Sequence, residues 1–350
     1  TFGFLNVFKY LTFRTGLSVF TSLIIVLIIG GPFIRFFSSQ KILNPIRDDG
    51  PEDHVIKKIG TPTMGGVIIL LGLLISVLCW GDLSNINILF CIYIAVTFGL
   101  LGAFDDYKKI KQSDSSGISS KFKIISQIIL AIIGVSFFVF LTDYQEINNL
   151  YFPFFKNLIF NLGWFFIPFA VFVIIGSSNA VNLTDGLDGL ATVPVILVAA
   201  CFAFISYVTG NIVFSNYLQI PYIDGTGEVS IFCGAIIGSC LGFLWFNAPP
   251  AKIFMGDTGS LSLGGSLGAV GIITKHEIVL AITGGLFVLE AVSVMVQVIS
   301  YKLTGKRIFK MAPIHHHFEK KGWAESTIVI RFWIITIVLA LIGLATLRIR

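Results

Sequence analysis

The fold class of this chain follows from the segment FKIISQIILAIIGVSFFVFLT, residues 122–142, which carries one charged side chain in 21 positions. Crossing a hydrocarbon core of about 30 Å takes roughly 20 helical residues, because an α-helix rises about 1.5 Å per residue. A membrane β-strand would instead alternate apolar and polar residues over about ten positions. The segment therefore predicts a membrane-spanning α-helix.

Nine other segments share this apolar character, and 55% of the 350 residues are hydrophobic against 12% charged. Soluble domains are much more polar. The nine segments lie at 16–36, 64–81, 86–104, 163–181, 187–208, 230–247, 259–274, 277–301 and 328–347. We predict an all-α integral membrane protein, a bundle of about ten transmembrane helices forming a single domain, 1–350. The glycine- and serine-rich run SLSLGGSLG (260–268) predicts close helix packing.

The distribution of Lys and Arg predicts the topology. With ten spans, alternate loops share a side, and one side then carries 18 of the 24 Lys and Arg residues. The other side carries only Lys9, Arg14, Lys156, Lys275, Arg348 and Arg350. The positive-inside rule places the basic side in the cytoplasm and both termini in the periplasm. A basic inner surface also attracts anionic lipids.

Four polar motifs fall on this cytoplasmic face beside a glycine-rich loop, GTPTMGG (60–66). They are FDDYKK (104–109), NLTDGLDG (182–189), FMGDTG (254–259) and MAPIHHHFEKKGW (311–323). The first three contain five aspartates at the edges of apolar stretches: Asp105, Asp106, Asp185, Asp188 and Asp257. Charge at such positions is costly, so it predicts function.

Asp105 and Asp106 are expected at the C-terminal end of the third span. There they face the negative end of the helix dipole and repel each other, so local stability does not favour them. A structural ion cluster with Lys108 and Lys109 is the alternative. Metal or phosphate chemistry explains the pair better.

The segment SSNAVNLTDGLDGLA (177–191) contains two polar pairs. Asn179 and Asn182 are three residues apart, as are Asp185 and Asp188, and helical spacing would place each pair on one face. Capping of the next helix is the alternative, although one residue suffices for a cap.

Asp257 lies between Gly256 and Gly259, just before the next span. Its own segment fits a helix N-cap as well as a ligand. Its predicted position on the same membrane face as the other aspartates favours a functional role.

The remaining motif residues are weaker candidates. Thr63 fits a phosphate contact or a cap. Gln297 and Glu290 are seven apart on one helix face and fit either a site or a hydrogen bond between helices. His315, His316 and His317 are adjacent and lack the spacing of a zinc site, so an anionic substrate fits better than zinc, with a solvated basic loop as the alternative.

Clustered carboxylates, basic side chains and glycine turns suit a divalent cation bound to phosphates. Mg²⁺ typically takes one or two protein carboxylates and completes its octahedron with water and substrate oxygens. Phosphoryl transfer depends mainly on positioning and charge neutralisation. These residues therefore predict Mg²⁺-dependent phosphoryl transfer.

The chain resembles the phospho-N-acetylmuramoyl-pentapeptide transferases, a branch of the polyprenyl-phosphate N-acetylhexosamine 1-phosphate transferases. The resemblance runs from NVFKYLTFRT (6–15) through the loop and aspartate motifs and FLWFNAPPAKIFMGDTGSL (243–261) to RIFKMAPIHHHFEKKGW (307–323). The aspartate motifs are typical of the superfamily, and MAPIHHHFE is typical of this branch.

The resemblance implies a transferase of the bacterial inner membrane. It implies transfer of phospho-MurNAc-pentapeptide from UDP-MurNAc-pentapeptide to undecaprenyl phosphate, giving lipid I and UMP. Besides these substrates and membrane lipid it implies Mg²⁺ and no nucleic acid. Apolar spans would also allow a homodimer.

The resemblance also implies residue roles. Asp257 resembles the magnesium ligand, and Asp105 and Asp106 resemble a pair that acts as base or orients the lipid phosphate. Further residues resemble the nucleoside and diphosphate pocket (Lys58, Asn179, Asn182, Asp185, Asp188, Asn247, Phe254), the sugar-peptide side (Gln297, His315, His316, His317) and the phosphate contacts (Lys109, Lys121, Lys123).

Alternatives remain open for mechanism and substrate. The lipid phosphate either attacks directly, which we favour, or an aspartate first forms an acyl-phosphate. A sister transferase would use UDP-GlcNAc. A transporter would carry carboxylates near mid-span and show internal repeats, whereas here the aspartates lie at one membrane face and the sequence contains no internal repeat.

Overall fold

The computed structural model describes residues 3–39, 61–112, 117–155 and 158–348. Their regular secondary structure is helical apart from one antiparallel hairpin, in which Asn149–Tyr151 pairs with Ile159–Asn161. The helices are η1 (Gly3–Lys9), α1 (Leu11–Ser39), α3 (Gly66–Trp80), α4 (Ile86–Gln112), α5 (Ser120–Leu141), η2 (Gly163–Phe165), α6 (Phe166–Thr184), α7 (Thr192–Thr209), α8 (Ile212–Leu218), η3 (Thr226–Glu228), α9 (Val229–Asn247), α10 (Gly256–Thr274), α11 (Glu277–Thr283), α12 (Gly285–Thr304), α13 (Ile314–Glu319) and α14 (Glu325–Ala345); the strands are β1 (Asn149–Tyr151) and β2 (Ile159–Asn161).

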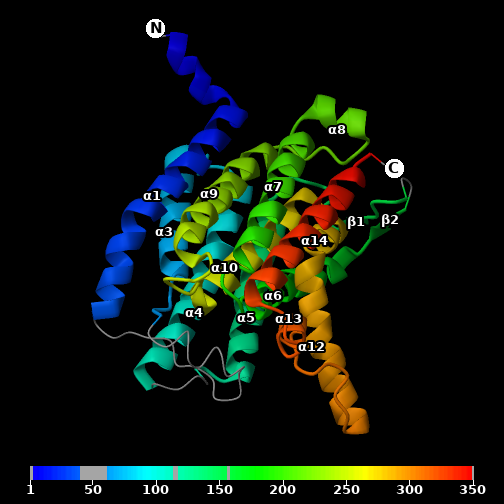
Figure 1. Cartoon of the computed structure of the whole chain (residues 1–350). Coiled ribbons are helices and arrows are strands. Elements are labelled where there is room, and N and C mark those ends of the chain that lie inside the picture. Colours follow the sequence, from blue (N-terminus) through cyan, green and yellow to red (C-terminus); the bar gives the residue numbers. More distant parts are fainter. Residues whose placement is uncertain (1–2, 40–60, 113–116, 156–157, 349–350) are drawn as a thin grey trace.

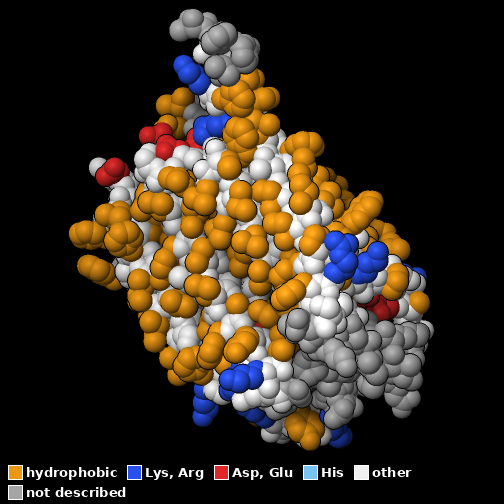
Figure 2. All heavy atoms as spheres, turned by 90° about the vertical axis from the view of Figure 1, so that its left-hand side faces the viewer, with side chains coloured by type: hydrophobic (Ala, Val, Ile, Leu, Met, Phe, Trp, Pro, Cys, Tyr) orange, Lys and Arg blue, Asp and Glu red, His pale blue; other side chains and the backbone are white. Residues whose placement is uncertain are grey.

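Eight helices in the described ranges are long and apolar enough to cross a membrane: α1, α4, α5, α6 with η2, α7, α9 with η3, α12 and α14. Helix α3 is apolar but has only 15 residues. Hydrophobic side chains cover the middle of the face in Figure 2, with most charged side chains toward its top and its lower and right-hand margins. The prediction of an all-α integral membrane protein is confirmed, and eight of the described helices are both long enough and apolar enough to cross the membrane.

Helix α10 forms the centre of the bundle (Figure 1), and all its residues from Thr258 to Thr274 are buried. It packs against α3, α4, α6 and α7. Glycine permits this approach: a Cβ added at Gly264 would lie 2.5 Å from the backbone oxygen of Ser177 on α6. Ser262 Oγ donates to Ala95 O at 2.7 Å. The glycine- and serine-rich segment therefore packs closely, as its composition predicts.

Replacing Gly264 by alanine should destabilise the protein by about 1–3 kcal/mol, because backbone atoms of α6 fill the space that a methyl group needs. The measurement is a lower unfolding temperature in detergent. Gly176→Ala on α6 is the matched control, since a Cβ there meets nothing within 4 Å. Equal unfolding temperatures for the two variants would contradict the packing argument.

The prediction that residues 277–301 form one continuous helix is wrong. The structure has α11 up to Thr283 and α12 from Gly285, and Gly284 caps both. A separate turn precedes α11, where Lys275 adopts the left-handed conformation with φ 59°. Its buried Nζ donates to Ile147 O at 2.8 Å and lies 3.1 Å from Glu277 Oε1.

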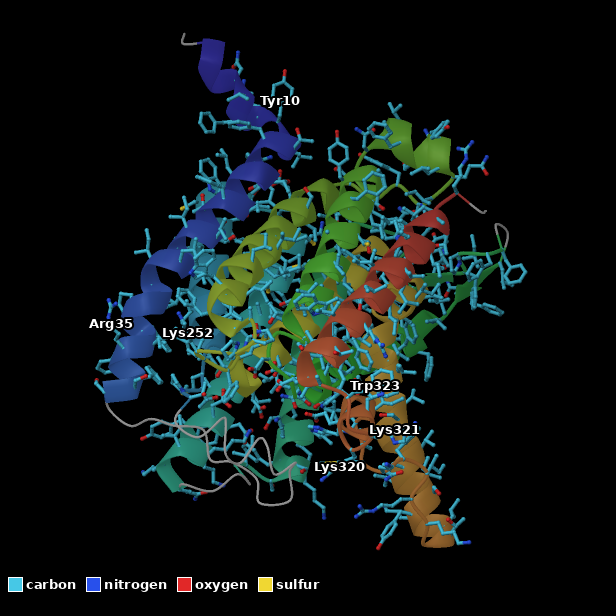
Figure 3. The ribbon with its side chains drawn as sticks, viewed as in Figure 1. Tyr10, Arg35, Lys252, Lys320, Lys321 and Trp323 are labelled. Carbon is cyan, nitrogen blue, oxygen red and sulfur yellow. The ribbon has the colours of Figure 1, made fainter. Side chains whose placement is uncertain are left out.

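The polar motifs and the two termini lie at opposite ends of the bundle. Both chain ends are at the top of Figure 1, whereas α13 and the N-terminus of α10 lie below. In Figure 3 the labelled Arg35, Lys252, Lys320 and Lys321 are in the lower half and Tyr10 is at the top. The arrangement brings the sequence-predicted site residues to one end.

Candidate active site

Helix α4 carries the first aspartate pair two turns before its end. The prediction that Asp105 and Asp106 close this helix is wrong, because α4 continues to Gln112. Lys109 and Lys111 lie in its last turn, where positive charge stabilises the negative end of the helix dipole. Both carboxylates are buried against neighbouring elements.

Asp106 holds the first turn of α10. Its Oδ1 accepts from the backbone N–H of Asp257 at 3.0 Å, and its Oδ2 accepts from Thr258 N (3.0 Å) and Thr258 Oγ1 (2.7 Å). Gly256, with φ +74°, allows this approach, since a Cβ there would lie 2.6 Å from Asp106 Oδ2. The carboxylate therefore satisfies helix N–H groups that lack partners within α10.

Asp105 and Asp257 share two lysines. Lys109 Nζ lies 2.8 Å from Asp105 Oδ2 and 3.1 Å from Asp257 Oδ2. Lys123 Nζ contacts Asp257 Oδ2 and lies 3.5 Å from Asp105 Oδ2. Asp105 Oδ1 accepts from the backbone N–H of Ile118 at 2.6 Å. Three segments, α4, α5 and α10, thus contribute to one charged cluster.

Asn182 of α6 adjoins this cluster, and Asn179 lies three residues before it on the same helix. Asn182 Nδ2 donates to Asp257 Oδ1 at 2.7 Å and to Ser260 Oγ at 2.8 Å. Asn179 Nδ2 donates to Gln127 Oε1 at 2.9 Å. The predicted shared face of these asparagines fits the structure, because both lie on α6. Lys121 is exposed on the first turn of α5.

The pair Asp185 and Asp188 lies in a turn. The predicted helical face for this pair is wrong, because α6 ends at Thr184 and α7 begins at Thr192. Gly189 adopts φ +72°, a conformation that glycine favours. Asp185 caps the C-terminus of α6, and Asp188 Oδ2 accepts from Ala251 N at 2.9 Å.

A cavity of about 350 Å³ opens beside this turn. Its lining consists of Thr61, Asp188, Pro249, Pro250, Ala251, Phe254, Glu325 and Ser326. Phe254 is half-buried, and its backbone pairs with the loop before α3, through Gly65 N to Phe254 O (2.9 Å) and Phe254 N to Pro62 O (2.9 Å). An aromatic ring and two carboxylates therefore face one cavity.

Asn247 supports the walls of the cavity, and neither it nor Thr63 is part of the lining. Asn247 Oδ1 accepts from Gly189 N (3.1 Å) and Thr192 Oγ1 (3.0 Å), while its Nδ2 donates to Ile253 O (3.0 Å). Thr63 is buried in the loop before α3. Lys58 lies outside the described residues.

The three histidines of α13 have three different surroundings. His315 is fully buried, with Nδ1 3.1 Å from Glu290 Oε1. His316 Nδ1 contacts Glu319 within α13. His317 Nδ1 accepts from the backbone N–H of Lys310 at 3.0 Å.

The pKa of His317 is lowered by its surroundings. Partial desolvation, and then the positive charges of Lys321 and Lys310, hold the pKa of its imidazole below the ordinary value. The ring is therefore neutral near pH 7, which agrees with its role as acceptor for Lys310 N–H.

Gln297 does not join the charged cluster. Its Oε1 accepts from the backbone N–H groups of Ile308 (3.0 Å) and Phe309 (2.9 Å), and its Nε2 donates to Phe309 O (3.0 Å). It fixes the loop that follows α12. His315 does approach the aspartate turn, because a Cβ at Gly186 would lie 2.3 Å from His315 Nε2.

Oxygen donors suited to a metal converge between Asp105 and Asp257, whose Oδ2 atoms contact the same two ammonium groups. Mg²⁺ prefers oxygen ligands and needs only one or two protein carboxylates when substrate phosphates are present. Across the described residues, no three His, Cys, Asp or Glu side chains surround one point. This pair could hold Mg²⁺ only if a phosphorylated ligand and water supplied the remaining oxygens.

Several residues of the site have only weak sequence signals. Gln127 is a polar residue within an apolar span, and Glu290 is an acidic one, both of which mark helix contacts or function in membranes. Glu325 looks like an ordinary acidic residue in the first turn of α14, where it suits the helix dipole. Its contact with the aspartate turn has no signal in the sequence.

The fold and this site define an integral membrane protein whose polar centre, at one end of the bundle, suits phosphorylated ligands. Residues 87–275 match Glycosyl transferase family 4, and residues 58–70 match the phospho-N-acetylmuramoyl-pentapeptide-transferase signature 1.

Curated relatives cover the whole chain. A phospho-N-acetylmuramoyl-pentapeptide-transferase of Pelagibacter ubique (strain HTCC1062) is 78% identical over 100% of this chain and 97% of its own length. One of Phenylobacterium zucineum (strain HLK1) is 54% identical over 99% and 95%, and one of Caulobacter vibrioides (strain NA1000 / CB15N) is 53% identical over the same shares. The chain belongs to the phospho-N-acetylmuramoyl-pentapeptide-transferase family and is a multi-pass protein of the bacterial inner membrane.

Proposed function

We propose that this protein transfers phospho-MurNAc-pentapeptide from UDP-MurNAc-pentapeptide to undecaprenyl phosphate, forming lipid I and releasing UMP. The observation that carries the proposal is the cluster in which Asp105 and Asp257 share the ammonium groups of Lys109 and Lys123. Such a cluster suits a diphosphate. Its Asp257 lies three residues after Phe254, which lines the cavity. The names of the relatives indicate the sugar-peptide that is transferred.

The cavity suits the nucleoside of the donor. The ring of Phe254 would stack on uracil, and Asp188 offers carboxylate oxygens to N–H and O–H donors. Asn247 would act on the ligand indirectly, because its amide is engaged by the walls. Contacts from Lys58, Thr63 and Asp185 stay predictions.

The charged cluster suits the diphosphate and the phosphate of the lipid. Asp257 would hold Mg²⁺, with Asp105 as the second carboxylate, and the bound ion would supply charge neutralisation for the diphosphate. Lys109 and Lys123 are already within reach of this position, and Lys121 lies exposed on the same helix as Lys123. Asn182 orients Asp257 through its 2.7 Å hydrogen bond.

The helix of histidines is assigned to the sugar-peptide side. His316 and His317 lie on its less buried part, whereas His315 anchors the helix on Glu290. Glu290 Oε2 also accepts from Ile314 N at 2.9 Å. Gln297 would act by fixing the preceding loop.

Direct attack by the lipid phosphate is the mechanism that we favour. Its second pKa is about 6, so it needs little activation at neutral pH. A phosphate oxygen attacks the β-phosphorus of the donor, the bond to the bridging oxygen breaks, and UMP leaves with that oxygen. One phosphoanhydride replaces another, so no other energy source is needed. Asp106, whose two oxygens accept three hydrogen bonds from α10, acts as a positioning residue.

The site is assigned to the cytoplasmic side, with ten crossings and both termini in the periplasm. The shorter α3 and the buried α10 would be the two crossings beyond the eight long apolar helices. The labelled basic side chains in the lower half of Figure 3 support this orientation through the positive-inside rule. The homodimer stays a prediction from the apolar surface.

The proposal predicts UMP release from UDP-MurNAc-pentapeptide in the presence of polyprenyl phosphate and Mg²⁺. Purified protein would be assayed with radiolabelled donor, and EDTA should abolish turnover because the diphosphate then lacks its counter-ion. UDP-GlcNAc is the matched donor control.

Turnover of UDP-GlcNAc alone would overturn the donor assignment. Without acceptor, direct attack predicts no labelled protein. A phospho-sugar trapped on Asp257 or Asp105 would instead establish the covalent route.

A further inference from the structure

Helix α14 holds the turn that carries Asp188. Glu325 Oε1 accepts from the backbone N–H of Asp188 at 3.0 Å. Trp333 Nε1 donates to the backbone oxygen of Gly189 at 3.3 Å. Glu325 and Trp333 are eight residues apart, so they lie on the same face of the helix two turns from each other. One face of α14 therefore forms hydrogen bonds with two successive residues of the turn.

Apolar packing fixes the helix in this position. Leu187 and Leu190, on either side of the gripped residues, form one buried cluster with Ile328, Val329 and Phe332 of α14. Because these side chains are almost fully buried, the turn and the helix move together.

The gripped turn sets the geometry of the cavity. Asp188 Oδ2 accepts from Ala251 N at 2.9 Å, which links the turn to the opposite wall. Gly189 has φ +72°, so the chain direction changes at this residue. Asp188 and Glu325 both line the cavity. Two carboxylates there repel phosphate groups and favour the uncharged, donor-bearing end of a nucleotide.

We propose that Glu325 is a positioning residue for nucleoside binding, and that with Trp333 it makes α14 the support of the Asp188 turn. This inference rests on the proposed function of the cavity as the nucleoside pocket. Glu325 then controls the affinity for the nucleotide donor. The chemical step and the lipid acceptor depend on the Asp105–Asp257 cluster, whose side-chain contacts come from Lys109, Lys123 and Asn182.

The test is steady-state kinetics of Glu325→Ala with UDP-MurNAc-pentapeptide as varied donor and saturating polyprenyl phosphate. Loss of a hydrogen bond to a charged acceptor should raise the donor KM and the inhibition constant of UMP about tenfold. The kcat should stay within about twofold, and the acceptor KM should not change. Glu325→Gln keeps an acceptor oxygen and should recover most of the donor affinity.

Thr327→Ala is the matched control in the same turn of α14, since its side chain does not line the cavity. Trp333→Phe keeps the ring but removes the N–H donor, and it should raise the donor KM about twofold to threefold. If Glu325→Ala does not fold, Trp333→Phe still tests the proposal.

Failure of the proposed function and failure of the role of α14 give different results. Absence of UMP release by the unsubstituted protein would overturn the proposed function itself. Normal turnover together with an unchanged donor KM in Trp333→Phe and in each Glu325 variant that folds would overturn the role of α14. A loss of kcat at constant KM would also overturn it, because it indicates less folded enzyme.

Discussion

Replacing Asp257 by asparagine should lower the rate of UMP release by about a thousandfold, with the helical fold retained. The carboxylate is the point at which Lys109, Lys123 and Asn182 meet, through contacts to its two oxygens. Removing its charge leaves Asp105 as the remaining carboxylate beside the two ammonium groups and removes the proposed Mg²⁺ ligand. Losses of about 10²–10³ follow removal of a single preorganised electrostatic contact, and a metal ligand lies at the upper end.

The measurement is kcat under saturating substrates, together with circular dichroism and the unfolding temperature in detergent. Asp143→Asn is the matched control, because Asp143 is exposed in the segment between α5 and β1. A Mg²⁺ titration adds a second readout, since loss of a ligand should raise the concentration needed for half-maximal rate. Retention of more than about a tenth of the activity would contradict the role of Asp257.

The helical bundle and the clustering of aspartates were predictable because their causes are local or additive. Long apolar runs indicate spans whatever their neighbours are, since every backbone group in lipid must be satisfied within the helix. Charged residues at the edges of spans are costly, so Asp105 and Asp257 could be assigned to one site. The structure then places both side chains on Lys109 and Lys123.

Residue roles were harder to predict because they depend on contacts between distant segments. The spacing of Asp185 and Asp188 indicated a helix, but Gly186 and Gly189 turn the chain instead. For Asp257 an N-cap was the alternative to a functional role, whereas the group that serves the first turn of α10 is Asp106, 151 residues away in sequence. A cap supplied by another helix leaves no local pattern, so the sequence did not indicate that Asp106 holds the first turn of α10.

Asp106→Asn should lower kcat about a hundredfold and also lower the unfolding temperature. The two oxygens of Asp106 accept three hydrogen bonds, from Asp257 N, Thr258 N and Thr258 Oγ1. In asparagine one of these two oxygens is replaced by an NH₂ group, which cannot accept a hydrogen bond. At least one buried donor would then lack a partner, and leaving a buried donor unsatisfied costs about 1–3 kcal/mol. The first turn of α10 would then shift, and Asp257 would shift with it.

Thr258→Val distinguishes this positioning role from direct catalysis. Valine has nearly the shape of threonine but cannot donate to Asp106 Oδ2. The variant therefore loses one of the hydrogen bonds that hold α10 and keeps the carboxylate of Asp106. A positioning role predicts that Thr258→Val lowers kcat and the unfolding temperature in the same direction as Asp106→Asn, by a smaller amount. If Asp106 acts directly on the reacting phosphates, Thr258→Val should leave kcat unchanged and Asp106→Asn should leave the unfolding temperature unchanged. The pair of variants therefore decides whether Asp106 acts on the substrate or through Asp257.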